Sequence, residues 1–390
     1  MPKLIKLYYI FLTNARLVFL LTIILSTSLF VDAQISSNNK LRTIVIDAGH
    51  GGKDPGTMGT KRYNKYEKDI ALSVSLILGK YISEAFPAIN IVYTRSKDVF
   101  LELHERTEIA NSANSDLFIS IHCDGFTNSK PSGASVFVMG MSKLKANLDV
   151  AMRENSAIYL EDNYKQKYDG FDPSSIESYI VFNLMQNTHL EQSLQLAEHV
   201  EQEFSTKANR KSRGVKQAPF YVISRTNMPS ILIECGFLTN PDEEDFLQSN
   251  IGQDYIASAI FRAFRSYKEG VENVHDLPEK KISSKHGVVH VEGTDKTENV
   301  KLVFKVQIGT YLESMKDHKL FVQIKAEEYL INNTFKYYIG NEVQKSNADK
   351  LRNKMLGLGF KGAFVVAFYK DAMISIKEAL ALQSKMKKNE

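Results

Sequence analysis

The sequence predicts an α/β domain with a mostly parallel sheet flanked by helices, followed by a small α+β domain. Short, branched apolar segments alternate with longer segments of helical periodicity over residues 42–268. A polar stretch at 269–299 then lacks any sustained period and is predicted to be a linker. A second set of strand and helix patterns occupies 301–382.

The predicted strands of the first domain are short runs rich in branched apolar residues: Thr43–Asp47, Ile89–Thr94, Asp116–Ile121, Ala134–Met139 and Ser230–Glu234. The predicted helices repeat apolar residues on one face: Glu67–Ser83, Leu101–Ala113 and His189–Phe204. One further helix follows Asn240, a good cap, with Pro241 at its first position, and its apolar stripe ends at Tyr267. Ligands of such sheets bind at the carboxyl ends of the strands.

Residues 141–187 interrupt this alternation. They are rich in Asn, Asp, Glu, Lys and Tyr, with Gly170 and Pro173 in the middle. We interpret them as a partly helical insertion on the strand-end side. In the second domain, the predicted strands and helix are Leu302–Ile308, Lys336–Ile339, Val343–Leu358 (the helix) and Gly362–Phe368, before a short terminal helix.

The N-terminus has the pattern of a secretory signal peptide. Lys3, Lys6 and Arg16 precede an almost wholly apolar run at 17–31, and small residues end at Ala33. An uncleaved anchor is the alternative, but a run of ~15 residues is short for a bilayer, which needs about 20. We therefore predict a signal peptide over 1–33 and an exported protein, periplasmic or cell-wall associated. Its removal lowers the net charge from +4 to +2, which gives no argument for nucleic acid binding.

The two cysteines, Cys123 and Cys235, each follow an apolar strand-like run. Export permits a disulfide between them. We interpret them instead as buried free thiols that act as small hydrophobic residues, with the disulfide as the alternative.

Four residues with metal-binding or acid–base chemistry lie at predicted strand ends or beside them: His50, Glu67, His122 and Glu234. Two imidazoles and one carboxylate are a common catalytic zinc set that leaves the fourth position for water. The remaining glutamate would serve as the general base. A single histidine at a strand end more often makes structural hydrogen bonds than binds a metal. Two such histidines together with two glutamates favour a metal site.

Three nearby residues have two interpretations each. Asp47 either orients His50 as a hydrogen-bond acceptor or is a structural carboxylate. Arg95 and Arg106 either bind substrate carboxylates or form structural ion pairs, which we favour.

The chain resembles the zinc-dependent N-acetylmuramoyl-L-alanine amidase family in four ordered motifs: IVIDAGHGGKDPGTMG, KYEKDIAL, DLFISIHCD and MPSILIECGFLTNPDEEDFL. The resemblance covers about 42–268 and implies one Zn²⁺ held by His50, Glu67 and His122, with Glu234 as the catalytic glutamate. It implies hydrolysis of the amide bond between the lactyl group of N-acetylmuramic acid and L-alanine in peptidoglycan, for wall remodelling or daughter-cell separation. The alternative is a non-catalytic peptidoglycan-binding or activator protein.

The insertion occupies the place where some members of this family carry a helix over the active site. By that resemblance Glu161 and Asp162 are candidates to reach the metal in an autoinhibited state, which an activator protein would relieve. Alternatively, Tyr159, Tyr164, Tyr168 and Tyr179 stack on sugars, or the insertion is a structural wall of the cleft.

The C-terminal part resembles a SPOR domain, a small peptidoglycan-binding module, in FKVQIGTY (304–311), FKYYIG (335–340) and GFKGAFVVAFYKD (359–371). This implies a ferredoxin-like α+β fold and binding of denuded glycan strands, which amidases create, at sites of division. An RNA-binding domain is the alternative, but the export signal and the lack of a basic stripe argue against a nucleic acid partner. The plainest alternative is a stabilising appendage.

Overall fold

The computed structural model describes residues 40–140, 142, 145–179, 189–208, 210–272, 302–331, 334–360, 362–370 and 372–386. The predicted signal peptide and nearly all of the predicted linker lie outside these residues. Within them, no helix is long and apolar enough to cross a membrane.

The first domain is built on a six-stranded sheet with the order β2-β1-β3-β6-β4-β5. Its strands are β1 (Thr43–Ala48), β2 (Asn90–Tyr93), β3 (Leu117–Asp124), β4 (Ala134–Met139), β5 (Ser212–Ala218) and β6 (Ser230–Phe237). All neighbouring strands are parallel except β4 and β6. The predicted mostly parallel sheet is therefore confirmed. The reversal at β4 puts the first residues of β4 and β5 at the same edge as the carboxyl ends of β1, β3 and β6.

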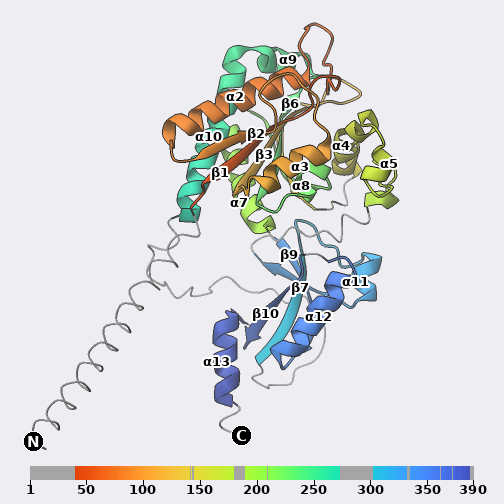
Figure 1. Cartoon of the computed structure of the whole chain (residues 1–390), viewed down its shortest axis with the longest axis vertical. Coiled ribbons are helices and arrows are strands. Elements are labelled where there is room, and N and C mark those ends of the chain that lie inside the picture. The colour runs from red at the N-terminus through yellow and green to blue at the C-terminus, as the bar shows by residue number, and fades with distance from the viewer. Residues whose placement is uncertain are drawn as a thin grey trace, which may run out of the picture. The chain divides into compact units, whose positions relative to one another are not determined.

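Helices cover both faces of this sheet (Figure 1). The helix α2 (Glu67–Ala85) packs against β1, β2 and β3, and α10 (Asn250–Glu272) runs beside it through ring contacts of Phe261 with Tyr81 and Phe86. On the other face, α3 (Leu103–Ser112) and α8 (Tyr221–Ser224) pack over a core that includes Phe118 and Phe137. The helix α7 (Leu190–Thr206) packs against β4, β5 and β6.

Two sequence predictions were incomplete in this domain. The single helix predicted after Asn240 is two helices, α9 (Pro241–Gln248) and α10, because Ser249 takes an extended conformation between them. Asn240 does cap α9, accepting from the amides of Asp242 and Glu243. The short β5 and α8 were not predicted, since SRGVKQA has little strand-like composition and forms a strand only by pairing with β4.

The insertion is partly helical, as predicted, where the structure describes it. It holds α4 (Lys145–Asn155), a 3₁₀ turn at Ser156–Leu160, α5 (Tyr164–Lys167) and a second 3₁₀ turn at Glu177–Tyr179. It lies on the α3 and α8 side, where Ala151, Ile158, Tyr168 and Tyr179 join the same core as Phe137. Residues 180–188 lie outside the described part.

The second domain has a five-stranded antiparallel sheet with the order β11-β10-β7-β9-β8. In chain order its elements are β7 (Leu302–Tyr311), α11 (Lys319–Gln323), β8 (Glu327–Ile331), β9 (Thr334–Glu342), α12 (Lys345–Gly357), β10 (Phe364–Tyr369), β11 (Ala372–Ile374) and α13 (Ile376–Met386). The first six form a β-α-β-β-α-β unit, as predicted for a ferredoxin-like fold. The sequence did not reveal β8 and β11, and placed no helix where the short α11 forms.

Candidate metal centre and active site

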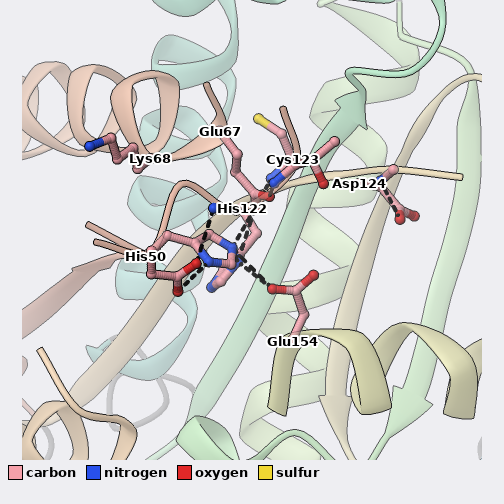
Figure 2. A network of polar contacts seen from close by, with 12 residues as sticks. His50, Glu67, Lys68, His122, Cys123, Asp124 and Glu154 are labelled. Carbon is pink, nitrogen blue, oxygen red and sulfur yellow. Dashed lines mark hydrogen bonds and ion pairs between the residues drawn. The ribbon is translucent and has the colours of Figure 1, made fainter. Parts of the chain in front are cut away.

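Two histidines and two glutamates from four separate elements converge at one edge of the first sheet (Figure 2). His50 follows β1, Glu67 opens α2, His122 lies in β3 and Glu154 comes from α4 of the insertion. His50 Nε2 lies 3.0 Å from Glu67 Oε1, 3.1 Å from Glu154 Oε2 and 3.1 Å from His122 Nδ1. His122 Nδ1 lies 3.1 Å from Glu67 Oε1 and 3.2 Å from Glu154 Oε2. The three predicted metal ligands therefore lie together, joined by a fourth group.

The spacing of these four groups fits a tetrahedral metal ion. Zinc with ligands at about 2.0–2.1 Å holds them roughly 3.3 Å apart at the corners of a tetrahedron. Five of the distances between the four ligand atoms are 3.0–3.2 Å. Glu154 Oε2 is fully buried and accepts no hydrogen bond from the described residues, although both imidazoles face it. A cation between the four atoms would satisfy it.

The charges of the cluster also favour a cation. Burial lowers the pKa of His50, but the carboxylates of Glu67, Asp54 and Glu154 outweigh burial and raise it well above its ordinary value. For Glu67, burial raises the pKa, yet the adjacent imidazoles lower it to about 2. The buried carboxylates thus demand positive charge, which either protonated histidines or a divalent ion can supply.

The loop that carries His50 is held in an uncommon conformation. His50 has φ of +59°, in the left-handed region that a non-glycine residue rarely adopts. Its carbonyl accepts from Arg106 Nη2 at 2.6 Å, while Arg95 donates to the carbonyls of Ala48 (2.9 Å) and Gly49 (2.7 Å). Both arginines are therefore structural, as we favoured, although Arg95 binds carbonyls rather than a carboxylate. They fix the direction in which the His50 ring points.

Gly49 is required at its position because His122 packs directly against it. A Cβ built on Gly49 would lie 2.4 Å from the His122 ring, well inside van der Waals contact. Any side chain there would push the imidazole away from the cluster. The GHG sequence thus serves the placement of the second histidine as well as the first.

Asp54, rather than Asp47, orients His50. Asp54 Oδ2 lies 2.8 Å from His50 Nδ1, the ring nitrogen that faces away from the cluster. Asp47 instead accepts from Arg106 (2.8 Å), Thr94 (2.7 Å) and Ser120 (2.7 Å). Burial raises the pKa of Asp47, but these donors outweigh burial and lower it. Of the two interpretations of Asp47, the structural carboxylate therefore agrees with these contacts. The sequence did not point to Asp54, because it lies in a turn with no strand or helix pattern.

Glu234 lies beside the cluster, paired in register with His122 on the neighbouring strand. Its side chain is buried, and neither carboxylate oxygen has a hydrogen-bond partner among the described residues. Burial, together with the negative charges of Asp124, Glu154 and Glu67, raises its pKa well above that of an ordinary carboxyl. An isolated buried carboxylate is costly, so its presence here points to a chemical use.

Glu154 is the site residue that sequence reasoning missed. The insertion candidates that we named, Glu161 and Asp162, do not reach the cluster. Glu161 accepts from the Tyr168 hydroxyl (2.7 Å) and from the amide of Leu103 (2.9 Å), and Asp162 is exposed. Helical spacing is the sequence feature that could have identified Glu154. It lies on the same buried face of α4 as Asn147 and Ala151, which precede it by seven and three residues.

Arg153, next to Glu154, also enters the site. Its guanidinium donates to Asp124 (2.7 Å) and to the carbonyl of Gly125 (2.7 Å), and lies 3.9 Å from Glu234. A cavity of about 260 Å³ beside the cluster is lined by both α4 residues together with His50, Glu67, Thr57 and Leu160. The helix α4 therefore forms one wall of the site (Figure 2).

Two of the four tyrosines of the insertion, and both cysteines, are buried. Tyr168 and Tyr179 are buried in the core of the insertion, whereas Tyr159 is exposed and Tyr164 is half-buried, so that sugar stacking remains a prediction for these last two only. Cys123 and Cys235 are buried free thiols, as we interpreted them. Their mutual hydrogen bond and burial raise the pKa of Cys123 well above its ordinary value.

This chain is similar in sequence to several known proteins. The family model described as N-acetylmuramoyl-L-alanine amidase matches residues 44–266. The amidase AmiA of Escherichia coli K12 is 35% identical over 235 residues, which are 60% of this chain and 78% of AmiA. AmiC of Escherichia coli O6:H1 is 31% identical over 57% of this chain and 52% of its own length. A crystal structure of an N-acetylmuramoyl-L-alanine amidase from Clostridium difficile 630 is 27% identical over 58% of this chain and 97% of its own, with a TM-score of 0.44.

The matched range, 44–266, contains all three predicted metal ligands, Glu234 and Glu154. Since it matches more than half of the chain, this chain belongs to the N-acetylmuramoyl-L-alanine amidase family.

Proposed function

We propose that this chain is a zinc-dependent amidase that hydrolyses the amide bond between the lactyl group of N-acetylmuramic acid and L-alanine in peptidoglycan. The observation that carries the proposal is the buried Glu234 carboxylate, which lacks a hydrogen-bond partner among the described residues and lies beside a tetrahedral set of metal-binding groups. Family membership supports the substrate.

His50, Glu67 and His122 would hold the zinc ion. Two imidazoles and one carboxylate are a common catalytic set for this metal. When bound, zinc supplies Lewis acidity toward the scissile carbonyl and toward water. Asp54 accepts a hydrogen bond from His50 Nδ1 and so keeps the Nε2 side of the ring turned toward the cluster.

Glu234 would move the proton. Its carboxylate takes a proton from the attacking water and returns it to the leaving amine of L-alanine. Burial raises its pKa, whereas a cation held by the neighbouring ligands favours its ionised form. These opposing effects suit a group that must both accept and release a proton in one turnover.

The deciding experiment is release of peptides from purified peptidoglycan by residues 34–390. We expect peptides with an L-alanine amino terminus, lost on treatment with a chelator and restored by zinc but not by magnesium. Protein that binds zinc and wall yet releases nothing would indicate either a closed insertion or the alternative of a non-catalytic binding protein.

We further propose that the insertion closes the active site through Glu154. Its carboxylate occupies the fourth corner of the ligand set, where water must bind, and Arg153 lies against Asp124 and Glu234. The same helix therefore blocks the position of the water and partly neutralises the base. An activator protein that withdraws α4 would open both at once.

Replacing Glu154 with alanine is expected to raise peptide release on the order of 10- to 100-fold, because a charge-assisted contact worth about 1.5–3 kcal/mol no longer holds α4 closed. The measurement is the initial rate on peptidoglycan, together with zinc content, which should not change. Asp149→Ala removes an exposed carboxylate of the same helix and should leave the rate unchanged. Equal rates for Glu154→Ala and the parent protein, with deletion of 141–178 also without gain, would exclude autoinhibition.

We also propose that the C-terminal domain binds denuded glycan strands and that the protein acts outside the cytoplasm, at sites of division. The order of strands β10-β7-β9-β8 supports a SPOR-type fold. Lys305 lies over the rings of Tyr329 and Phe368, so the sheet face opposite α12 carries aromatic and cationic groups together. Truncation at residue 300 is expected to abolish co-sedimentation with glycan stripped of stem peptides while peptide release continues. Unchanged co-sedimentation would leave the domain a stabilising appendage.

A further inference from the structure

Two cations on β5 lie at the active-site edge without a carboxylate partner. Lys216 Nζ donates to Ser135 Oγ at 2.9 Å and lies 5.3 Å from the centre of the Phe137 ring. The guanidinium of Arg213 lies over the Phe237 ring and donates to the carbonyl of Ser132. Within the described part of the chain, neither side chain has a carboxylate within 4.0 Å.

Lys216 ends a row of side chains that begins at the metal cluster. His122 in β3 pairs with Glu234 in β6, and Glu234 pairs with Ser135 in β4, all in register. Ser135 then contacts the ammonium of Lys216 from β5. Ser135 and Phe137 are two residues apart and so share one face of the sheet, which is the face that α4 covers. The row thus runs from a proposed zinc ligand, through the proposed base, to a lysine.

We propose that Lys216, with Arg213 beside it, binds a carboxylate of the stem peptide one residue beyond the L-alanine whose amide bond is cut. This proposal rests on the proposed amidase function.

The dimensions agree. Opposed residues of antiparallel strands are about 5 Å apart, so the Lys216 ammonium lies roughly 8 Å from Glu234 once its hydrogen bond to Ser135 is added. A peptide extends about 3.3–3.6 Å per residue, so a carboxylate two residues from the scissile carbonyl lies about 7 Å away. In stem peptides the residue after L-alanine is a glutamate joined through its side chain, which leaves an α-carboxyl that is either free or amidated.

The electrostatics favour an anion at this point. The rest of the site is acidic: Asp124 and Glu234 are buried on neighbouring strands, and Glu67 is buried at the start of α2. In the closed state Arg153 balances two of them, but that residue belongs to α4 and leaves with it. Burial, with a contribution from Arg213, lowers the pKa of Lys216 to about 8, so a bound carboxylate would stabilise the ammonium that burial disfavours.

The test compares two soluble substrates, N-acetylmuramoyl-L-alanyl-glutamate with its α-carboxyl free or amidated, on the full mature chain. If the closed insertion silences that protein, every arm carries Glu154→Ala. The parent enzyme is expected to prefer the free carboxyl by about 10- to 100-fold in kcat/KM, mostly through KM. Lys216→Met should abolish this preference and leave the rate on the amidated substrate within about threefold, whereas Lys216→Arg should retain it.

Each outcome has a separate meaning. A parent enzyme that cuts both substrates equally overturns the proposal without any variant. Equal loss on both substrates in Lys216→Met would give Lys216 a structural role instead, and thermal unfolding of that variant would confirm it. If neither substrate nor peptidoglycan is cut by any protein that holds zinc, the amidase function itself has failed, and not the assignment of Lys216.

Discussion

Replacing Glu234 with alanine is expected to lower peptide release from peptidoglycan by about 10²–10⁴-fold, the usual contribution of a positioned general base and acid. Zinc content should stay at one ion per chain, because Glu234 is not among the four groups whose ligand atoms converge. Glu198→Ala, which removes an exposed carboxylate on α7, is the matched control and should keep full activity. Full activity in Glu234→Ala would refute the assignment.

Replacing Glu234 with glutamine, which keeps its size but cannot ionise, should have a distinctive effect on stability. The folded protein raises the pKa of Glu234 above that of the unfolded chain, so the folded state binds its proton more tightly. In the metal-free protein this carboxyl therefore makes stability fall as pH rises through the range above its unfolded pKa. Glu234→Gln should remove that part of the pH dependence, measurable as a higher midpoint of thermal unfolding at neutral pH. A lower midpoint would indicate that the carboxylate is structural.

Replacing His122 with alanine is expected to remove both the metal and the activity. Only two of the three proposed protein ligands would then remain to hold the ion. The buried carboxylate of Glu67 would also lose a positive neighbour. We expect zinc below a tenth of one ion per chain after dialysis, and peptide release reduced on the order of 10³-fold or more, since the metal supplies most of the activation. The readouts are metal analysis and the initial rate.

His104→Ala is the matched control for this prediction. His104 also lies near two glutamates, Glu102 at 3.2 Å and Glu161 at 3.9 Å, and these three residues form a second group with metal-binding atoms. Lys167 already pairs with Glu102 in that group, which leaves no need for a cation. His104→Ala should therefore keep its zinc and its rate. Zinc loss in His104→Ala but not in His122→Ala would move the metal to the second group.

The sequence pointed to the site because each of the four residues that it predicted there follows a recognisable local pattern. His50, His122 and Glu234 end short apolar runs, and parallel strands bring such ends to one edge of a sheet, so proximity followed from topology. The helix that Glu67 opens was equally readable from its apolar spacing. The boundaries were less certain: Ser249 breaks a helix that its apolar pattern would continue.

The contributions from the insertion could not be read in this way. Glu154 and Arg153 reach the site because α4 packs against the core formed by Phe137 and Phe220, and no local pattern states on which neighbour a helix packs. Glu161, which looked equally suitable, is turned away by its hydrogen bonds with Tyr168 and Leu103.

The sequence by itself determined the α/β class, most of its elements and four residues that meet at one edge of the sheet, because periodicity and strand-end position are local properties of the chain. Only the tertiary structure decided that Asp54 rather than Asp47 contacts the His50 ring, that Glu154 joins the cluster, and that Lys216 lies in one row with Glu234. These relations depend on strand register and on the packing of distant segments, which are settled by long-range burial and not by any neighbouring residue.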